Sequence, residues 1–455
     1  MSQELEYELA EQALKFAHNP PEPLLALAAR HITDFIGVFL AGAEVEEMRG
    51  YLQALQVDAG LRGSVEGFTL KCALSSSAKA SFLGAAAHMH DFDDDEPAVA
   101  VGHPTVAVAA AAFSTADPDA DTRMVLASYL AGIEVINRLG LCVNPDHYNR
   151  GWHATATLGA FGSAATSAIL RGADAGQLAN ALRFAASFSS GLKASFGSTA
   201  KPIQVGHAAA SGVRAAAIAT SGVQASPGIL FGKTGWVDIQ GAINKVVDAV
   251  AGFGSPHAFE EPGLNIKLYP CCSSSHTAID GIIDIISAQK IDVDDIASID
   301  AWIGPDIPGI LIYDFPTTGL EGKFSLRYPI AIAALNGRIT LSDFESDKVK
   351  APKVVELMKR IRVHIDPTLP RAPAGVTHCS RIKVTTVEGA VSERFTLQPR
   401  GSSLLPLSTE ELFEKFALCA EGVLNSGAKE AFDKLMAMPN KSQLIGVLEA
   451  TRLHR

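Results

Sequence analysis

Basic residues are scarce in this chain of 455 residues. Lys and Arg total 38 against 49 Asp and Glu, which gives a formal net charge of -11. Proteins that bind nucleic acid usually carry a basic patch or stripe, and the sequence has none. We therefore predict no nucleic-acid partner. An anionic substrate would need a locally basic pocket inside an otherwise acidic protein.

Long apolar runs and paired cysteine motifs are also missing. No stretch offers about 20 clean apolar residues, so we predict no membrane partner. The first eight residues are acidic and polar, unlike a secretory or transit peptide. The cysteines lack CxxC or metal-ligand spacing, which indicates reduced buried thiols and a cytoplasmic protein. These six cysteines are Cys72, Cys142, Cys271, Cys272, Cys379 and Cys419.

The signatures of several large enzyme classes are absent. Residues 252–254 (GFG) lack the third glycine and the strand-to-helix setting of a dinucleotide-binding loop. The sequence has no glycine-rich phosphate loop, GxSxG elbow or HExxH helix. Hydride transfer, phosphoryl transfer and zinc hydrolysis thus lose support. Acid–base chemistry by His, Lys and Asp remains.

Length and hydrophobic spacing predict a mainly α protein with more than one domain. The chain is too long for one compact core, and 47% of its residues are hydrophobic. Apolar residues recur at helical spacing, and abundant Ala and Gly suit closely packed helices. The predicted helices are 21–40, 77–89, 104–114, 122–139, 155–171 and 208–220.

The pattern changes near Pro262, where strand-like segments begin. Residues 360–366 alternate with period two, and 381–397 predict a β-hairpin that turns at 388–389. A further strand is expected near the end of 291–303, with helices at 275–288 and 353–359. We predict a smaller α+β domain over 263–400.

A helix is expected again after residue 400. Ser408 and Glu411 have the spacing of a capping box at its start. We expect this tail to pack back on the first helices. The large all-helical domain would then be discontinuous, formed by 1–262 and 401–455.

Five acids and three histidines fall within the sixteen residues from His88 to His103. Because each buried charge needs a partner, we expect most of Asp93–Glu96 to form a solvated loop. Metal binding is a second interpretation, which the spacing does not support, so no metal is predicted. In a third interpretation, one acid orients His103 as a general base in a pocket.

Two further polar segments coincide with predicted helix starts. His153 lies where backbone N–H groups and the helix dipole favour anions, and Tyr148 and Arg150 lie just upstream. A structural role for His153 is the alternative. Lys201 precedes Pro202 at a helix entrance, where it could face a pocket or remain a surface lysine.

The segment 265–276 crosses the predicted domain boundary, and clefts between domains favour binding sites. Lys267 and His276 flank its turn. The adjacent Cys271 and Cys272 have no obvious activating partner, so we interpret them as packing residues. Arg327, further along, could clamp a carboxylate or simply begin a helix.

Taken in order, these segments resemble the MmgE/PrpD family along nearly the whole chain. The segment between Asp91 and His103 is longer and more acidic than is usual in the family's dehydratases, and 399–403 lacks the usual Gly-Asp/Asn-Pro-Pro-like run. The resemblance rests on HDFDD at 90–94, GHP at 102–104, GWHATATLG at 151–159, KP at 201–202, GHAA at 206–209, KLYPC at 267–271, HTAID at 276–280 and KFS at 323–325.

The resemblance implies a large all-helical domain, a smaller α+β lid domain and usually a homodimer. The family includes 2-methylcitrate dehydratase, cis-aconitate decarboxylase and iminodisuccinate epimerase. It implies an active site between the domains with no metal or organic cofactor. The family's site residues fall on Asp91, His103, His153, Lys201 and His276, and less securely on Lys267 and Tyr148.

These residues suggest chemistry at the carbon next to a carboxylate of a small di- or tricarboxylate. We expect Lys201, Lys267 and the helix start at His153 to hold carboxylates. His103, oriented by Asp91, would exchange the proton, with His276 or Tyr148 on the opposite face. The leading expectation is a lyase similar to 2-methylcitrate dehydratase. An epimerase of iminodisuccinate or a related amino-dicarboxylate, an inactive carboxylate-binding member and a scaffold whose acidic loop recruits a partner are the alternatives.

Overall fold

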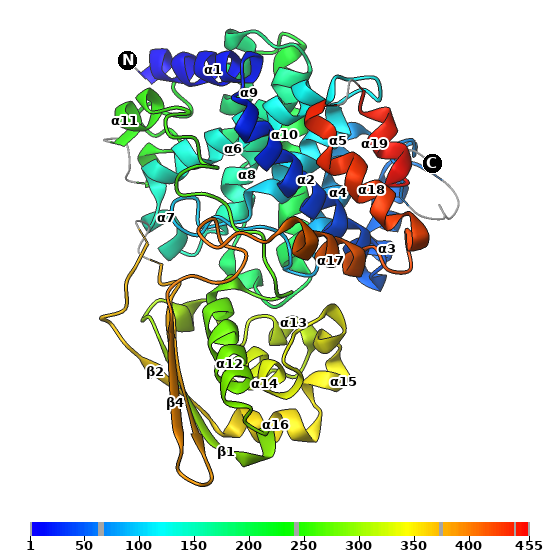
Figure 1. Ribbon diagram of the computed structural model, residues 1–455. Coiled ribbons are helices and arrows are strands. Elements are labelled where there is room, and N and C mark those ends of the chain that lie inside the picture. The colour runs from blue at the N-terminus through cyan, green and yellow to red at the C-terminus, as the bar shows by residue number, and fades with distance from the viewer. Residues whose placement is uncertain (1, 62–67, 241–244, 373–375, 441–442, 454–455) are drawn as a thin grey trace.

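The computed structural model describes residues 2–61, 68–240, 245–372, 376–440 and 443–453, which are mainly α-helical. Figure 1 shows a large group of helices above a smaller part that contains the sheet. The helices before residue 262 are α1 Ser2–His18, α2 Glu22–Ala43, α3 Glu46–Asp58, α4 Ser76–His88, α5 Pro104–Thr115, α6 Thr122–Val143, α7 Asp146–Asn149, α8 Ala154–Leu170, α9 Ala175–Phe188, α10 Ala200–Thr220 and α11 Val246–Ala251. We call this group, with the C-terminal helices described below, the helical body.

Small residues let the central helices of the body approach closely. Helix α10 packs against α8 and α4. A Cβ atom at Gly206 of α10 would lie 2.1 Å from the carbonyl oxygen of Ser81, so only glycine fits there. The same is true of Gly42, where a Cβ would lie 1.8 Å from the carbonyl oxygen of Ala86. The helices predicted from Ala-rich spacing are confirmed, most with ends shifted by a few residues. The helix predicted at 208–220 is longer and begins at Ala200.

The smaller part holds a four-stranded sheet in the order β2-β1-β3-β4. Strand β1 pairs in parallel with β2, with Ile299 opposite Ile361, and antiparallel with β3, with Ala301 opposite Ile382. Helix α12 packs on β3 and β4, and α14 lies beside it (Figure 1). The elements are α12 His276–Gln289, β1 Ile296–Ile303, α13 Gly319–Gly322, α14 Arg327–Asn336, α15 Ser346–Val349, α16 Pro352–Lys359, β2 Ile361–Ile365, β3 Ser380–Thr386 and β4 Val391–Thr396.

The predicted strands and hairpin are confirmed. Strands β3 and β4 are antiparallel neighbours, and Lys383 lies opposite Glu393. Gly389 in their connection has φ +85°, a left-handed conformation that glycine adopts without steric cost. Alternate residues of β3, such as Ile382 and Val384, are buried under α12, as the period of two requires.

The C-terminal helices return to the helical body. Helices α17 and α18 contact α2, and Lys415 of α17 forms an ion pair with Asp34 of α2 at 2.6 Å. Helix α17 begins with the predicted capping box, because Ser408 and Glu411 each accept a backbone N–H from the other. The domain boundaries near 262 and 400 stay a prediction. These helices are α17 Thr409–Cys419, α18 Ala428–Met436 and α19 Ile445–Ala450.

Two helices, α2 and α6, have the length and apolar composition that a membrane span would need. In α2, 78% of the most apolar window is buried inside the protein, and in α6 the value is 94%. Burial of this extent is what core helices show, so the two helices give only weak evidence for a membrane.

Candidate active site

A pocket lies where the helical body meets the sheet part, and four helix starts converge on it. Its wall includes His103 before α5, His153 and Thr155 at the start of α8, and Lys201 in the first turn of α10. Cys272, Ser273 and Ser274, just before α12, supply the opposite side. The space free of protein atoms, open mouth included, is about 490 Å³. Helix N-termini carry positive partial charge, so their convergence favours an anion.

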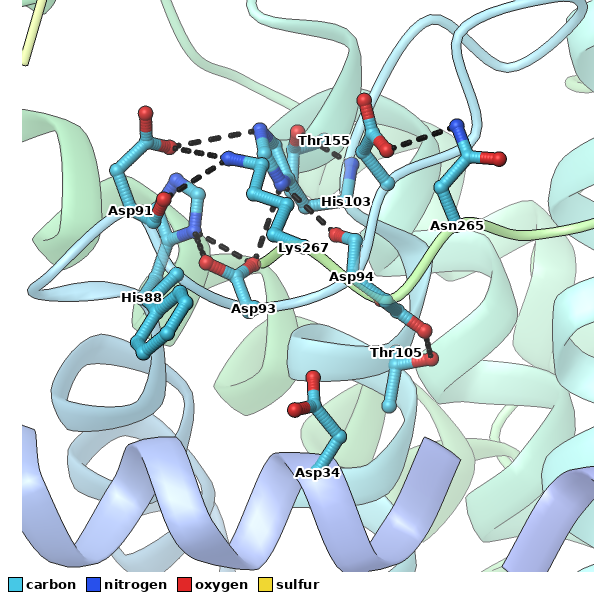
Figure 2. A network of polar contacts seen from close by, with 12 residues as sticks. Asp34, His88, Asp91, Asp93, Asp94, His103, Thr105, Thr155, Asn265 and Lys267 are labelled. Atoms are coloured by element: carbon cyan, nitrogen blue, oxygen red, sulfur yellow. Dashed lines mark hydrogen bonds and ion pairs between the residues drawn. The ribbon is translucent and has the colours of Figure 1, made fainter. Parts of the chain in front are cut away.

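Asp91 joins the two sides of the pocket through two buried lysines, Lys201 and Lys267. Figure 2 shows Asp91 beside Lys267. Its Oδ1 accepts a hydrogen bond from Lys201 Nζ at 2.8 Å and lies 3.2 Å from Lys267 Nζ. Lys267 Nζ also donates to the Asp91 carbonyl oxygen at 2.9 Å. Burial would raise the pKa of Asp91, but the two lysine charges outweigh it and hold that pKa well below its usual range. Asp91 is therefore a fixed anion that holds two cations in place.

Lys201 keeps part of its hydrogen-bonding capacity for a ligand. An ammonium group has three donors, and only the bond to Asp91 engages Lys201 within the described residues. Its Nζ lies 5.3 Å and 5.1 Å from the ring centroids of Phe196 and Phe324, which also line the pocket. These rings keep water from that side of the ammonium, which strengthens its attraction for a carboxylate.

The tautomer of His103 follows from its partners. Nδ1 lies 2.9 Å from the carbonyl oxygen of Asp94, which can only accept, so Nδ1 carries the proton. Asp93 Oδ2 lies 3.3 Å from the same nitrogen. The other nitrogen, Nε2, is left with its lone pair, 3.7 Å from Asp91 Oδ1. His103 is thus arranged as a base, and Asp93 with the Asp94 carbonyl orients it. The expected orientation by Asp91 stays a prediction, since its contact with His103 is the longer one, at 3.7 Å.

His153 repeats this arrangement on the next helix. Its Nδ1 lies 3.2 Å from Gln204 Oε1, an oxygen that already accepts the Leu192 N–H at 2.9 Å. Nδ1 therefore donates, and the buried Nε2 has no hydrogen-bond partner among the described residues. Burial, followed by the nearby Lys201 charge, holds the pKa of His153 well below its usual range. The pocket thus contains a neutral imidazole, His153, with a free acceptor nitrogen.

Two residues of the pocket wall have a strained backbone. Asp91 has φ +52° and Val101 has φ +54°. Aspartate tolerates this left-handed region, but a β-branched valine rarely adopts it. Next to Val101, a Cβ at Gly102 would lie 2.9 Å from Thr155 Oγ1. The loop before α5 is therefore pressed against the start of α8, as is common where a structure fixes a functional group.

The acidic segment after Asp91 is buried, so the prediction of a solvated loop is wrong. Each acid has found a partner inside the protein. Asp94 Oδ2 lies 2.6 Å from His31 Nδ1, and Asp95 Oδ1 accepts from Asn265 Nδ2 at 3.1 Å. Glu96 accepts backbone N–H groups from residues 98–100, and burial raises its pKa to about 7. The partners of Asp94 and Asp95 come from distant elements, which local sequence does not show.

One cluster has the residue types of a metal site. Single ligand atoms from His88, Asp91, Asp93 and His103 lie within 4.8 Å of one another. The charges around it oppose a cation, because Lys201 and Lys267 already occupy Asp91 Oδ1. His88 Nδ1 also lies 2.8 Å from Asp93 Oδ2. These residues therefore form an internally paired network and do not fit a metal ion.

The structure brings most of the predicted site residues together. Asp91, His103, Tyr148, His153 and Lys201 line the pocket, and Lys267 joins them through Asp91.

Three predicted residues lie elsewhere. His276 Nε2 faces the Cys271 carbonyl oxygen at 3.1 Å, so its side chain is used inside its own turn. Arg150 is exposed and reaches the Ile239 carbonyl at 3.4 Å. Arg327 is bound to Asp314. None of the three is among the described residues that line the pocket, because each side chain is bound elsewhere.

Sequence reasoning missed several residues of the pocket wall. Thr155 lies inside a quoted motif and holds the His103 N–H through its Oγ1 at 3.0 Å. Cys272 was interpreted as packing only, although its place before a helix was a usable signal. His378, two residues before the start of β3, has no local signal and reaches the pocket through the fold alone.

Two family models match the chain. The MmgE/PrpD N-terminal domain matches residues 8–246, and the MmgE/PrpD C-terminal domain matches residues 269–438. Human cis-aconitate decarboxylase is 26% identical over 367 residues, which cover 78% of this chain and 74% of that protein. The mouse cis-aconitate decarboxylase is 25% identical over 430 residues, covering 88% and 83%. The two models together span most of the chain, which belongs to the MmgE/PrpD family.

Proposed function

We propose that this protein is a lyase that acts on a small polycarboxylate at the carbon next to a carboxylate. The observation that carries the proposal is the pairing of fixed cations with free bases in one pocket. Lys201 and Lys267 are held by Asp91, and His103 turns its Nε2 towards them while Nδ1 is bound to the Asp94 carbonyl. The similarity to two cis-aconitate decarboxylases supports the lyase class.

The difficulty of such a reaction is the electron pair left on carbon when a bond next to a carboxylate breaks. That pair spreads onto the carboxylate as an enediolate, which fixed cations and helix N-termini stabilise. The free donors of Lys201 and the starts of α8 and α12 supply this stabilisation. Where the reaction removes a proton from carbon, as in a dehydration, His103 Nε2 takes it up.

An unsaturated tricarboxylate such as cis-aconitate is the first candidate substrate, because both compared relatives carry that activity in their names. Decarboxylation breaks a carbon–carbon bond, releases carbon dioxide and leaves a carbon that takes a proton.

Two other reactions of this kind would use the same pocket. Dehydration of a hydroxy-tricarboxylate such as 2-methylcitrate uses the same cations. Epimerisation of iminodisuccinate needs only two bases, and His103 with His153 could supply them. A homodimer in the cytoplasm is the expected setting for each of these reactions.

A substrate panel in deuterated water tests the proposal. The panel contains cis-aconitate, 2-methylcitrate, iminodisuccinate and aspartate derivatives, with product identified by NMR. Loss of carbon dioxide or water supports a lyase. Deuterium exchange without either loss marks an epimerase, and no change across the panel marks a binding role; both results contradict the proposal.

The variant His103→Ala tests the role of the base. We expect it to lower kcat by about 10² to 10⁴, the usual contribution of a general base. Its circular dichroism and thermal unfolding should match the wild type. Near-normal turnover in this variant would remove His103 from the mechanism.

A further inference from the structure

Two neighbouring cysteines occupy very different places at the start of α12. Cys271 is completely buried, and its Sγ lies 3.4 Å from Ser275 Oγ. Cys272 lines the pocket, on the side contributed by the sheet part, and is 9% exposed. Its backbone N–H donates to the Lys323 carbonyl at 3.0 Å, which fixes the turn. Only Cys272 can therefore meet a ligand in the pocket.

Two groups across the pocket from Cys272 indicate that a ligand lies between them and this thiol. Asp91 Oδ2 and His153 Nε2 are buried pocket atoms without a hydrogen-bond partner among the described residues. Buried polar atoms are rarely left unpaired in a folded protein, so both atoms indicate a ligand that supplies hydrogen-bond donors. Cys272 borders the same space.

The thiol of Cys272 lies within electrostatic reach of the other groups in the pocket. Burial raises its pKa, and the Asp91 charge adds to this, while Lys267, the Ser274 N–H and Lys201 act in the opposite direction. The thiol therefore rests protonated and serves as a donor. His103 and His153, in contrast, present acceptors. Burial raises the pKa of the Tyr148 phenol far above its usual range, which leaves it the weaker acid of the two donors.

We propose that Cys272 is the catalytic acid of this pocket and delivers a proton to the reacting carbon from the side of the sheet part. This inference rests on the proposed lyase function. In a decarboxylation, the carbon–carbon bond breaks and its electron pair moves into the remaining conjugated carboxylate. The carbon then takes the proton of the S–H group, a C–H bond forms, and the thiolate remains beside Lys267. Water returns a proton to the thiolate after carbon dioxide and product leave.

The test compares Cys272→Ala and Cys272→Ser with the matched control Cys271→Ala, using the full chain and the substrate that the panel identifies. We expect both Cys272 variants to lower kcat by about 10² to 10⁴ with little change in KM. Cys271→Ala should keep wild-type kcat, because that thiol does not reach the pocket. Equal kcat in Cys272→Ala and the wild type would overturn the inference.

The pH profile separates an acid from a structural residue. In the wild type, kcat should fall at alkaline pH as the thiol loses its proton. The residual activity of Cys272→Ser should lack this decline, because a serine hydroxyl does not ionise in that range. An unchanged alkaline decline in Cys272→Ser would contradict the proposal.

Labelling and the variant His103→Ala distinguish a failure of the proposed Cys272 role from a failure of the proposed lyase function. At alkaline pH, where the thiol loses its proton, iodoacetamide should alkylate Cys272, as located by mass spectrometry, and the substrate identified by the panel should protect it at saturation. Alkylation at the same rate with and without that substrate would contradict a pocket position. If the wild type converts the substrate and His103→Ala does not, the proposed function stands. A fully active Cys272→Ala in that setting removes only the cysteine. A wild type that converts nothing removes the lyase function itself.

Discussion

The protein contains two buried aspartate–lysine networks that differ in their surroundings. In the pocket, Asp91 binds Lys201 at 2.8 Å and Lys267 at 3.2 Å. In the helical body, Asp34 binds Lys415 at 2.6 Å, and that lysine also donates to the Phe92 carbonyl at 2.7 Å. Figure 2 shows Asp34 on its helix, beside the pocket network. Lys201 faces open space, whereas Lys415 is closed in.

The two carboxyl groups have opposite pKa shifts. Burial raises the pKa of Asp34 to about 6, because the single Lys415 only partly offsets the loss of water. The pKa of Asp91 is lowered because two lysines outweigh the same loss. The number of cations thus decides whether a buried carboxylate stabilises or strains the fold. The surplus positive charge at Asp91 is also what an anionic substrate requires.

The largest effect should come from removing one carboxylate charge at a time. Asp91→Asn leaves two buried ammonium groups without their anion, and Asp34→Asn leaves one. Breaking a buried ion pair typically costs about 3–5 kcal/mol, so both variants should lose free energy of unfolding in urea titrations. The value of kcat/KM should differ between the two variants. Asp91→Asn should lose at least about 10-fold in kcat/KM, because its lysines are released, and Asp34→Asn should keep wild-type kcat/KM.

A matched pair of variants sharpens this result. Replacing both partners in the body, Asp34→Leu with Lys415→Met, should restore much of the lost stability, since well-packed apolar pairs often substitute for buried ion pairs. Activity should remain. If this double variant loses turnover as Asp91→Asn does, the two networks are not functionally distinct.

A smaller effect should appear in the pH dependence of stability. Asp34 has a pKa of about 6 in the folded protein against 3.8 ordinarily. Between these values the folded state binds more protons than the unfolded state, so the Asp34 contribution to unfolding free energy falls as pH rises and levels off above about 6. Asp91 has the opposite sign: its contribution is lost only as pH falls below about 4.

Urea titrations of wild type and Asp34→Asn between pH 4 and 7 measure this slope. As pH rises to about 6, the free energy of unfolding of the wild type should fall relative to that of the variant. Above pH 6 the two free energies should change with pH in the same way. Parallel curves over the whole range would show that Asp34 does not titrate in the expected window.

The smallest effect should come from the helix that carries Lys415. Ser408→Ala removes the side chain that accepts the Glu411 N–H at 3.1 Å, the first half of the capping box of α17. A lost N-cap costs about 1 kcal/mol, so the melting temperature should fall slightly while kcat/KM stays unchanged. A change in kcat/KM would mean that α17 influences the pocket. Ser403→Ala, in the preceding loop, is a control outside the cap.

Much of the fold could be predicted because its signals are local. Helical spacing located α4, α5, α6 and α8 within a few residues, and alternation located β3 and β4. Short-range signals also located Ser408 and the helix starts at His153 and Lys201. Such features depend on neighbours a few positions away, which the sequence displays directly.

The errors concern contacts between distant segments. Asp93 to Glu96 were expected in solvent because each buried charge needs a partner, yet the fold supplies His31 to Asp94 and Asn265 to Asp95. Arg327 was expected at the substrate, but Asp314 binds it.

The sequence by itself determined the helices, the strands and the family resemblance, since periodicity, capping and motif order are properties of the chain. Only the tertiary structure decided which polar groups share the pocket. It places Asp91 between Lys201 and Lys267, turns His276 away and brings Cys272 to the wall. The physical reason is that burial and pairing set the charge of each group, and both depend on residues far apart in the sequence.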